Sequence, residues 1–168
     1  MKIRYNLGII LCFLVFCTIA CDKSPNPMKD TLSVSNDNAE PIDVIYLGKV
    51  VIGEMDKKYG VDPFRLNSAM IENDTMKVSV SYSGGCKPHE FTLVSSDVFL
   101  ESDPVQLMVS IAHNANDDTC EAYPTEDYSF DLTPIKTMYQ NAYGQDAGTI
   151  VIRLKDNPDG ELVYKFDK

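Results

Sequence analysis

The stretch Met76-Lys77-Val78-Ser79-Val80-Ser81-Tyr82 alternates apolar and polar residues without interruption. Successive side chains of a β-strand point to opposite faces of a sheet, so this period of two indicates a strand with one face in a core. The Asn73-Asp74 pair just before it is typical of a turn, and it leads back to a second apolar segment, Leu66–Ile71. We therefore predict that these two segments form a β-hairpin.

The same alternation recurs in shorter stretches along the rest of the chain. It covers the segments that begin at Phe91, Val105, Tyr128, Ile150 and Leu162. Turn signals separate these segments roughly every 8–15 residues, and no long amphipathic helix alternates with them. The pattern predicts an all-β fold, an antiparallel immunoglobulin-like β-sandwich whose chain ends in a hairpin.

Two segments depart from this simple alternation. Ile42–Ile52 is rich in β-branched residues and contains Gly48, which predicts one bent strand or a short hairpin. In the C-terminal third, Thr133 suits a helix cap, Pro134 suits the first helical position and Gly144 suits a helix stop. We expect one short helix there, closing one end of the sheets.

The first residues of the chain carry a targeting pattern. Lys2 and Arg4 precede a 14-residue uncharged run, Leu7–Ala20, which is shorter than the roughly 20 apolar residues of a membrane-spanning helix. The run ends in Thr18-Ile19-Ala20-Cys21, which resembles the lipobox of bacterial lipoproteins. This resemblance implies that Cys21 becomes the acylated N-terminus of the mature protein.

We therefore divide the chain into three parts. Residues 1–20 are expected to be a lipoprotein signal peptide, and residues 21–41 an acylated cysteine with a flexible tether rich in Ser, Asn, Asp and Pro. Residues 42–168 are expected to form the β-sandwich domain. The membrane is then a partner through the lipid anchor, and the expected location is the bacterial cell envelope, extracytoplasmic and either periplasmic or surface-exposed.

The charge of the chain narrows the choice of other partners. Asp and Glu number 25 against 15 Lys and Arg, for a formal net charge of −10. Nucleic-acid binding needs clustered Lys and Arg to neutralise phosphates, so we expect no nucleic-acid partner. A protein or glycan of unknown identity stays open as a partner, and exposed tyrosines such as Tyr123 could contribute to such a surface.

The cysteine count predicts one disulfide. Cys12 and Cys17 leave with the signal peptide and Cys21 carries lipid, so that only Cys86 and Cys120 belong to the expected domain. A single pair in an oxidising compartment is typical of a disulfide.

The two cysteines could instead be free, buried thiols. The two histidines of the chain each lie near one of these cysteines, and this leaves two further alternatives open. Cys86, His89, His113 and Cys120 could together hold Zn²⁺ or Cu(I), whose ligand preferences include thiolate and imidazole. Alternatively, Cys86 could be a nucleophile activated by one of the histidines. His113 also continues the apolar face of Val105–Ile111. This position favours a structural role for its imidazole ring at the edge of the core over a role as a metal ligand.

Other chemical motifs are weak in this sequence. The acidic segment Asn116–Glu121 lacks the alternating oxygen ligands and glycine of a helix–loop–helix calcium site, so we interpret it as a solvated turn. No Gly-x-Ser-x-Gly, His-Glu-x-x-His or paired-carboxylate pattern stands out. We expect no enzyme activity, no catalytic residue and no cofactor.

Three stretches resemble a known group. Val80 to Leu93 through Cys86, His113-Asn114-Ala115-Asn116-Asp117, and Phe130-Asp131-Leu132 resemble uncharacterised bacterial lipoproteins and are similar to the C-terminal β-sandwich of NigD-like proteins. The resemblance covers roughly Asn73 to Leu154. It implies a surface or periplasmic lipoprotein with a sandwich domain, and it supplies no established activity.

Taken together, these features predict a non-enzymatic, lipid-anchored protein of the envelope or cell surface that acts as a binding or structural accessory module. The alternative function is a lipoprotein that binds Zn or Cu through the Cys₂His₂ set.

Overall fold

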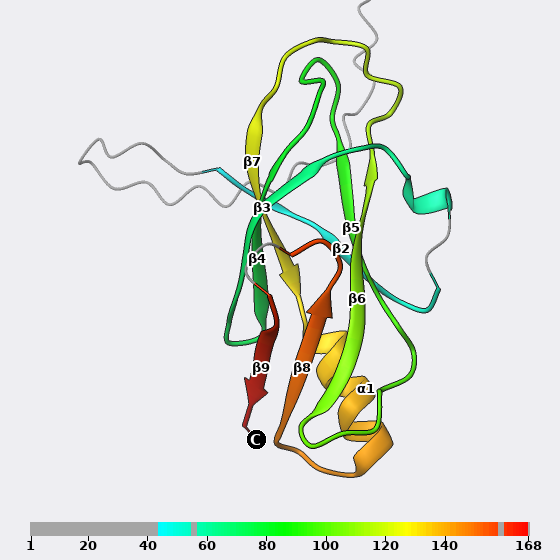
Figure 1. Ribbon diagram of the computed structural model, residues 1–168, viewed down its shortest axis with the longest axis vertical. Coiled ribbons are helices and arrows are strands. Elements are labelled where there is room, and N and C mark those ends of the chain that lie inside the picture. Colours follow the sequence, from blue (N-terminus) through cyan, green and yellow to red (C-terminus); the bar gives the residue numbers. More distant parts are fainter. Residues whose placement is uncertain (1–43, 55–56, 158–159, 168) are drawn as a thin grey trace, which may run out of the picture.

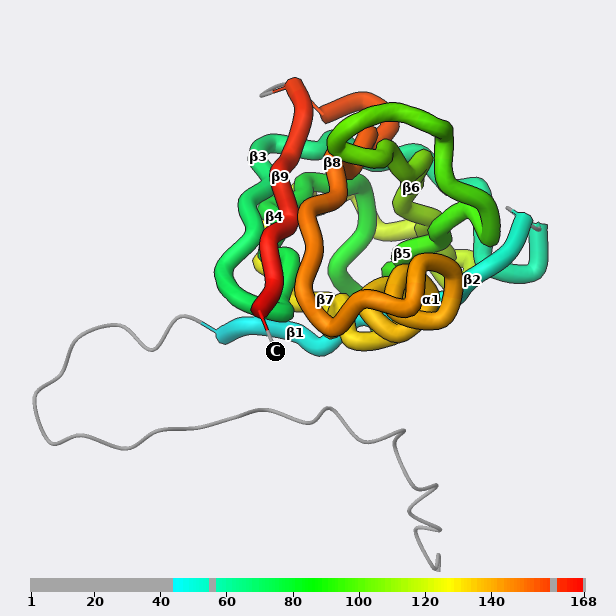
Figure 2. Tube along the Cα trace, turned by 90° about the horizontal axis from the view of Figure 1, so that it is seen from below, coloured from blue at the N-terminus to red at the C-terminus, as the bar shows by residue number. Residues whose placement is uncertain are grey.

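The structure, a computed structural model, describes residues 44–54, 57–157 and 160–167. Two β-sheets face each other around one core, as Figure 1 and Figure 2 show. The first sheet has the order β1-β7-β4-β3, formed by Ile45–Leu47, Thr125–Asp131, Thr75–Ser81 and Arg65–Glu72. The second has the order β2-β5-β6-β8-β9, formed by Lys49–Ile52, Glu90–Ser95, Val105–Asn114, Gly148–Leu154 and Leu162–Phe166. The helix α1 (Thr133–Tyr143) and the 3-10 turn η1 (Lys57–Tyr59) complete the described elements, and the predicted mostly-β sandwich with one short helix is confirmed.

The hairpin predicted from the alternating stretch is present as β3 and β4. Its turn residue Asn73 has a positive φ of 53°, a conformation that Asn tolerates better than most residues. Met76, Val78 and Val80 are buried on the inner face of β4, whereas Lys77 and Ser79 lie on the outer face. The period of two thus determines which side chains form the core.

The expectation of antiparallel pairing throughout is wrong. The pairs β1–β7, β2–β5 and β6–β8 are parallel, and the other strand pairs of the described chain are antiparallel. Parallel neighbours require a crossover connection, and α1 lies on the connection from β7 to β8 that sets β8 beside β6. A side-chain period of two is the same for both directions, so alternation alone does not distinguish them.

The segment before β3 crosses from one sheet to the other. β1 pairs with β7 in the first sheet, and β2 pairs with β5 in the second, with Gly48 between them. Gly48 donates its N–H to Ser129 O at 2.8 Å. A Cβ at this position would overlap the Phe130 ring, so only glycine allows so close an approach. Neither predicted form is observed, because the segment forms two short strands that belong to different sheets and do not pair with each other.

The helix α1 forms where it was predicted, although its cap differs. Leu132, not Thr133, holds the N-cap position, and it provides no side-chain cap. Asp131 Oδ1 instead accepts hydrogen bonds from the Thr133 N–H at 2.9 Å and the Thr133 hydroxyl at 2.6 Å. Gly144 ends the helix in the left-handed conformation, with φ of 64°, as predicted.

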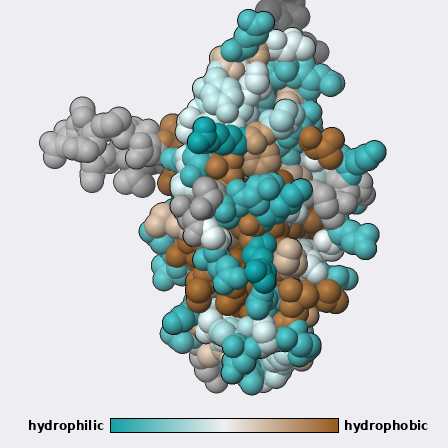
Figure 3. Space-filling model, in the orientation of Figure 1, coloured by the Kyte–Doolittle hydropathy of each residue, from teal (hydrophilic) through white to brown (hydrophobic). Residues whose placement is uncertain are grey.

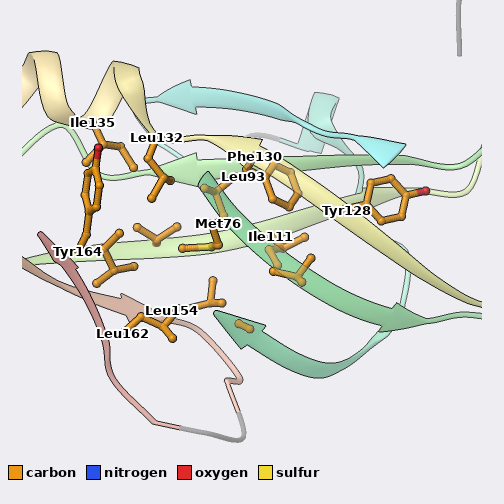
Figure 4. Packing of buried hydrophobic residues seen from close by; sticks show 14 of the residues in the cluster. Met76, Leu93, Ile111, Tyr128, Phe130, Leu132, Ile135, Leu154, Leu162 and Tyr164 are labelled. Carbon is orange, nitrogen blue, oxygen red and sulfur yellow. The ribbon is translucent and has the colours of Figure 1, made fainter. Parts of the chain in front are cut away.

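The core fills the space between the two sheets. Figure 4 shows Met76, Leu93, Ile111 and Phe130 from different strands directed toward one another. At the end where α1 lies, Tyr164 is fully buried and its hydroxyl donates to Asp74 Oδ1 at 2.6 Å. We call this region the helix end, defined as α1, the turn at residues 73–74 and the buried side chain of Tyr164.

The outer surface is mixed. In Figure 3 apolar residues of the visible face gather between the two ends of the molecule, and the ends themselves are mostly hydrophilic or neutral. Within the described ranges, no helix has the length and apolar character to cross a bilayer. The predicted signal peptide, Cys21 and the tether lie outside the described residues.

Candidate functional site

Two loops meet at the end of the molecule opposite α1, and we call them the loop end: residues 82–89 and residues 115–124 (Figure 1). The first loop connects β4 to β5 and the second connects β6 to β7, so each crosses from one sheet to the other. Their backbones pair directly. Tyr82 N–H donates to Pro124 O at 3.3 Å, and Gly84 N–H donates to Ala122 O at 3.0 Å.

A disulfide links the two loops. Cys86 and Cys120 are bonded, with their Cα atoms 6.0 Å apart and 34 positions apart in sequence. This is the pairing that the cysteine count predicts. In the chain-entropy description, closing a loop of this length stabilises a fold by about 3–4 kcal/mol.

The carboxylate of Asp118 organises the first loop. Its Oδ2 accepts three consecutive backbone N–H groups, from Gly85 at 2.8 Å, Cys86 at 2.8 Å and Lys87 at 2.9 Å. Its Oδ1 accepts the N–H of Cys120 at 3.0 Å, two residues further along its own loop. Since the Asp118 side chain is 1% exposed, these bonds replace the water that a carboxylate would otherwise bind.

These hydrogen bonds keep Asp118 ionised. The N–H groups of Cys120 and Lys87 are the main groups that lower the pKa of the Asp118 carboxyl, and they outweigh the opposing effect of burial. On the outside of the same loop, the Lys87 ammonium donates to Asn116 O at 3.0 Å and to Asp117 O at 2.7 Å.

A chain of polar side chains runs inward from Asp118. His89 Nε2 lies 3.2 Å from Asp118 Oδ2, and His89 Nδ1 lies 2.8 Å from His113 Nε2. His113 Nδ1 lies 3.2 Å from the carbonyl oxygen of Pro63. Both histidines are buried, at 9% and 1% exposure, so every ring nitrogen has a protein partner in place of water.

Aromatic rings enclose this histidine pair. Tyr82 stacks on His89 with ring centroids 4.1 Å apart, and Phe91 stacks on His113 at 4.3 Å with an angle of 9° between the rings. Gly84, with φ of 142°, leaves room for the outer ring, because a Cβ there would lie 2.5 Å from His89 Nε2. The rings are therefore held in one orientation.

A second polar group lies beside the pair. Glu126 Oε2 accepts hydrogen bonds from the hydroxyls of Tyr82 at 2.7 Å and Tyr128 at 3.0 Å. Burial raises the pKa of both tyrosines, and the neighbouring Glu126 carboxylate raises them further, so both phenols stay protonated donors.

The structure brings together all four residues that the sequence singled out, in an arrangement that differs from a metal site. The sulfurs of Cys86 and Cys120 are bonded to each other and offer no thiolate in this form, either as ligands or as a nucleophile. His113 Nε2 faces His89. Binding of Zn or Cu stays the untested alternative to a protein without metal, and His113 is the buried structural ring that its position on β6 predicts.

Sequence reasoning missed Asp118. It lies in the acidic segment 116–121, whose interpretation as a solvated turn is wrong for this side chain, because the carboxylate is buried. One local signal was available. An Asp that accepts the N–H two residues later forms an Asx-turn, and Asp118-Thr119-Cys120 has that spacing.

One comparison with a known structure supports the fold. A NigD-like immunity protein from Bacteroides caccae is similar in structure, with a TM-score of 0.52 and 18% sequence identity, over 85% of this chain and 73% of that one. A protein of unknown function from Bacteroides vulgatus matches with a TM-score of 0.44 and 13% identity, over 74% of this chain. No family model matches and no curated protein matches.

The chain spans 58% of the length of the Bacteroides vulgatus protein. The similarity to the NigD-like immunity protein confirms the predicted resemblance at the level of the fold. These identities are too low to transfer an activity, because one fold hosts many functions.

Proposed function

We propose that this protein is a lipid-anchored, extracytoplasmic protein of the bacterial cell envelope that acts as a binding or structural accessory module and has no enzyme activity. The observation that carries this proposal is the disulfide between Cys86 and Cys120 at the loop end. Disulfides persist in oxidising compartments outside the cytoplasm. The lipobox-like sequence that ends at Cys21 supports the same compartment independently.

The loop end is the part of the domain best suited to contact a partner. The disulfide and the bonds to Asp118 hold its two loops in one arrangement, and a preorganised surface loses less conformational entropy on binding than a mobile one. Lys87, Asp117 and Tyr123 are exposed on it, and Tyr123 is 64% exposed. Aromatic residues are common anchors of protein interfaces.

The reactive side chains of the loop end are all bonded to other groups of the protein, and this supports a role without catalysis. The two sulfurs are bonded, Asp118 accepts four backbone N–H groups, and both histidine rings are enclosed. The similar fold of a protein named as an immunity protein also supports an accessory role.

Labelling with an alkyne fatty acid in a bacterial host tests the anchor. Wild-type protein should carry the label and Cys21→Ser should carry none. Cys12→Ser, another cysteine near the N-terminus, is the matched control and should be labelled like wild type. A labelled Cys21→Ser protein would contradict the proposed anchor.

Site-specific photocrosslinking tests the binding surface. A photoreactive residue at Tyr123 on the loop end should form a discrete adduct in intact cells. The same residue at Val163, which is 52% exposed on β9, should not. Equal yields at both positions, or an adduct at Val163 alone, would contradict a role for the loop end.

A further inference from the structure

We infer that His89 and His113 together form a buried site for one proton, so that the pair carries a single positive charge opposite the Asp118 carboxylate and completes the contact between the two loops. This inference goes beyond the proposed function. It holds whether or not the loop end binds a partner.

The hydrogen-bond partners determine the number of protons. Asp118 Oδ2 is a carboxylate oxygen and Pro63 O is a carbonyl oxygen, so each can only accept. His89 Nε2 and His113 Nδ1 must therefore both carry hydrogen. The 2.8 Å contact between His89 Nδ1 and His113 Nε2 needs a third hydrogen, on either nitrogen. Two neutral imidazoles carry two hydrogens, so these three bonds require one proton more.

Fewer or more protons fit the geometry worse. With no extra proton, one of the three contacts would set two acceptors against each other inside the protein, which is costly for buried polar groups. With two extra protons, His89 Nδ1 and His113 Nε2 would both carry hydrogen and oppose each other at 2.8 Å. Burial, and then the nearby His89, lower the pKa of His113, in agreement with the exclusion of a second charge.

The surrounding charges favour one positive charge at this place. Asp118 lies next to His89, and Asp62 lies beside the inner ring, where its Oδ2 accepts the N–H of Ala115 at 2.7 Å. The titratable groups that lie against the pair are Asp62 before β3, Tyr82 after β4 and Asp118 in the second loop. Glu126 and Tyr128 on β7 lie one step further out, where Glu126 accepts the hydroxyls of both tyrosines. The turn η1, with Lys57, Lys58 and Tyr59, packs against β6, the strand that carries His113. Lys87 in the first loop directs its ammonium to the carbonyl oxygens of Asn116 and Asp117.

A shared proton gives the stability of the fold a distinctive dependence on pH. Two histidines in the unfolded chain titrate near pH 6.5 and bind close to two protons below that pH and none well above it. If the folded pair holds one proton throughout, unfolding releases protons above pH 6.5 and takes them up below it. Stability then has a maximum near pH 6.5 and falls on both sides. A pair without the extra proton would only gain stability as the pH rises.

Nuclear magnetic resonance measures the proton count directly. The chain has 2 histidines, so histidine labelled with ¹⁵N reports on this site alone. With a chelator present to exclude metal binding, the ¹⁵N shifts of the folded protein at pH 7 should show three hydrogens shared by the four ring nitrogens. Two hydrogens, or four, would overturn the inference.

A conservative variant distinguishes the proton from the packing. The double variant His89→Gln and His113→Gln keeps an amide donor and acceptor at both positions and has no ring left to take up a proton in this range. Denaturant unfolding from pH 6.5 to 8.5 should show falling stability for wild type, with up to about one proton released per molecule, and no such fall for the double variant. If the two curves are parallel, the histidines act only through packing. If the double variant does not fold, the labelled wild-type protein still decides the question.

Discussion

The loop end and the helix end of the sandwich are held by different interactions. At the loop end, a disulfide and a carboxylate that accepts four backbone N–H groups join two loops around a buried histidine pair. At the helix end, the side chains of Ile135 and Tyr164 are fully buried, as is Leu132, the N-cap residue of α1. One end depends on covalent and polar contacts, and the other depends on apolar packing.

Both ends nevertheless contain an aspartate that bonds to other elements. Asp118 is 1% exposed and is bonded by backbone N–H groups. Asp74 is 43% exposed and is bonded by side chains, the Tyr164 hydroxyl and the Lys136 ammonium at 3.2 Å. Irregular loops leave backbone N–H groups without a partner strand, so a buried carboxylate can accept their hydrogen bonds. The compact turn at the helix end has fewer such N–H groups.

The largest expected effect is a cavity at the helix end. Ile135→Ala removes a side chain with 0% exposure, and we expect a loss of folding free energy toward about 5 kcal/mol, the upper limit for such truncations. Denaturant unfolding measures it. Val163→Ala, at an exposed site, is the control and should change stability by about 0.5 kcal/mol or less. A small effect of Ile135→Ala would mean that apolar packing does not hold this end.

Removing the disulfide tests the loop end. The double variant Cys86→Ser and Cys120→Ser should lose about 3–4 kcal/mol in the chain-entropy description. The loss should also be local. Relative to wild type, the variant should show a larger increase in amide hydrogen exchange at Gly85 and Lys87 than in β4. Unchanged exchange in both loops would show that the Asp118 contacts suffice to hold the loop end.

The smallest expected effect concerns the exposed aspartate. Tyr164→Phe removes the donor to Asp74, and we expect a loss of about 1 kcal/mol, because Asp74 can regain water. The Tyr164 hydroxyl is also the main group that lowers the pKa of Asp74. A lowered pKa stabilises the fold above pH 3.8, and this contribution is lost as the pH falls through the folded pKa. The difference between wild type and Tyr164→Phe should therefore shrink in acid, and a difference that grows below pH 3.8 would contradict this contact.

The predictable part of this fold follows local patterns. The alternation in Met76–Tyr82 predicts β4 and its buried face, and Asn73 and Gly144 predict a turn and a helix stop at the correct places. Strand direction was not predictable, because parallel and antiparallel strands share the same side-chain period. The crossing between sheets at Gly48 was not predicted, since the close approach there involves Phe130, 82 positions away in sequence.

The candidate site divides in the same way. The cysteine count predicts the link between Cys86 and Cys120, and the position of His113 on its strand predicts a buried ring. The role of Asp118 depends on three N–H groups from a loop more than thirty residues earlier, which a local acidic segment does not reveal. The contact of His89 with His113 likewise depends on β5 pairing with β6.

The sequence by itself determined which residues form most of the strands, which strand faces are apolar, and which two cysteines can form the disulfide. Strands and their faces depend on neighbours in the chain, and the disulfide follows from the number of cysteines in the domain. Only the tertiary structure decided the strand directions, the partner of Asp118 and the number of protons that the histidine pair can hold. Those properties arise from groups that are distant in sequence and become neighbours when the two sheets close, and a buried polar group takes whichever partner lies within hydrogen-bond distance.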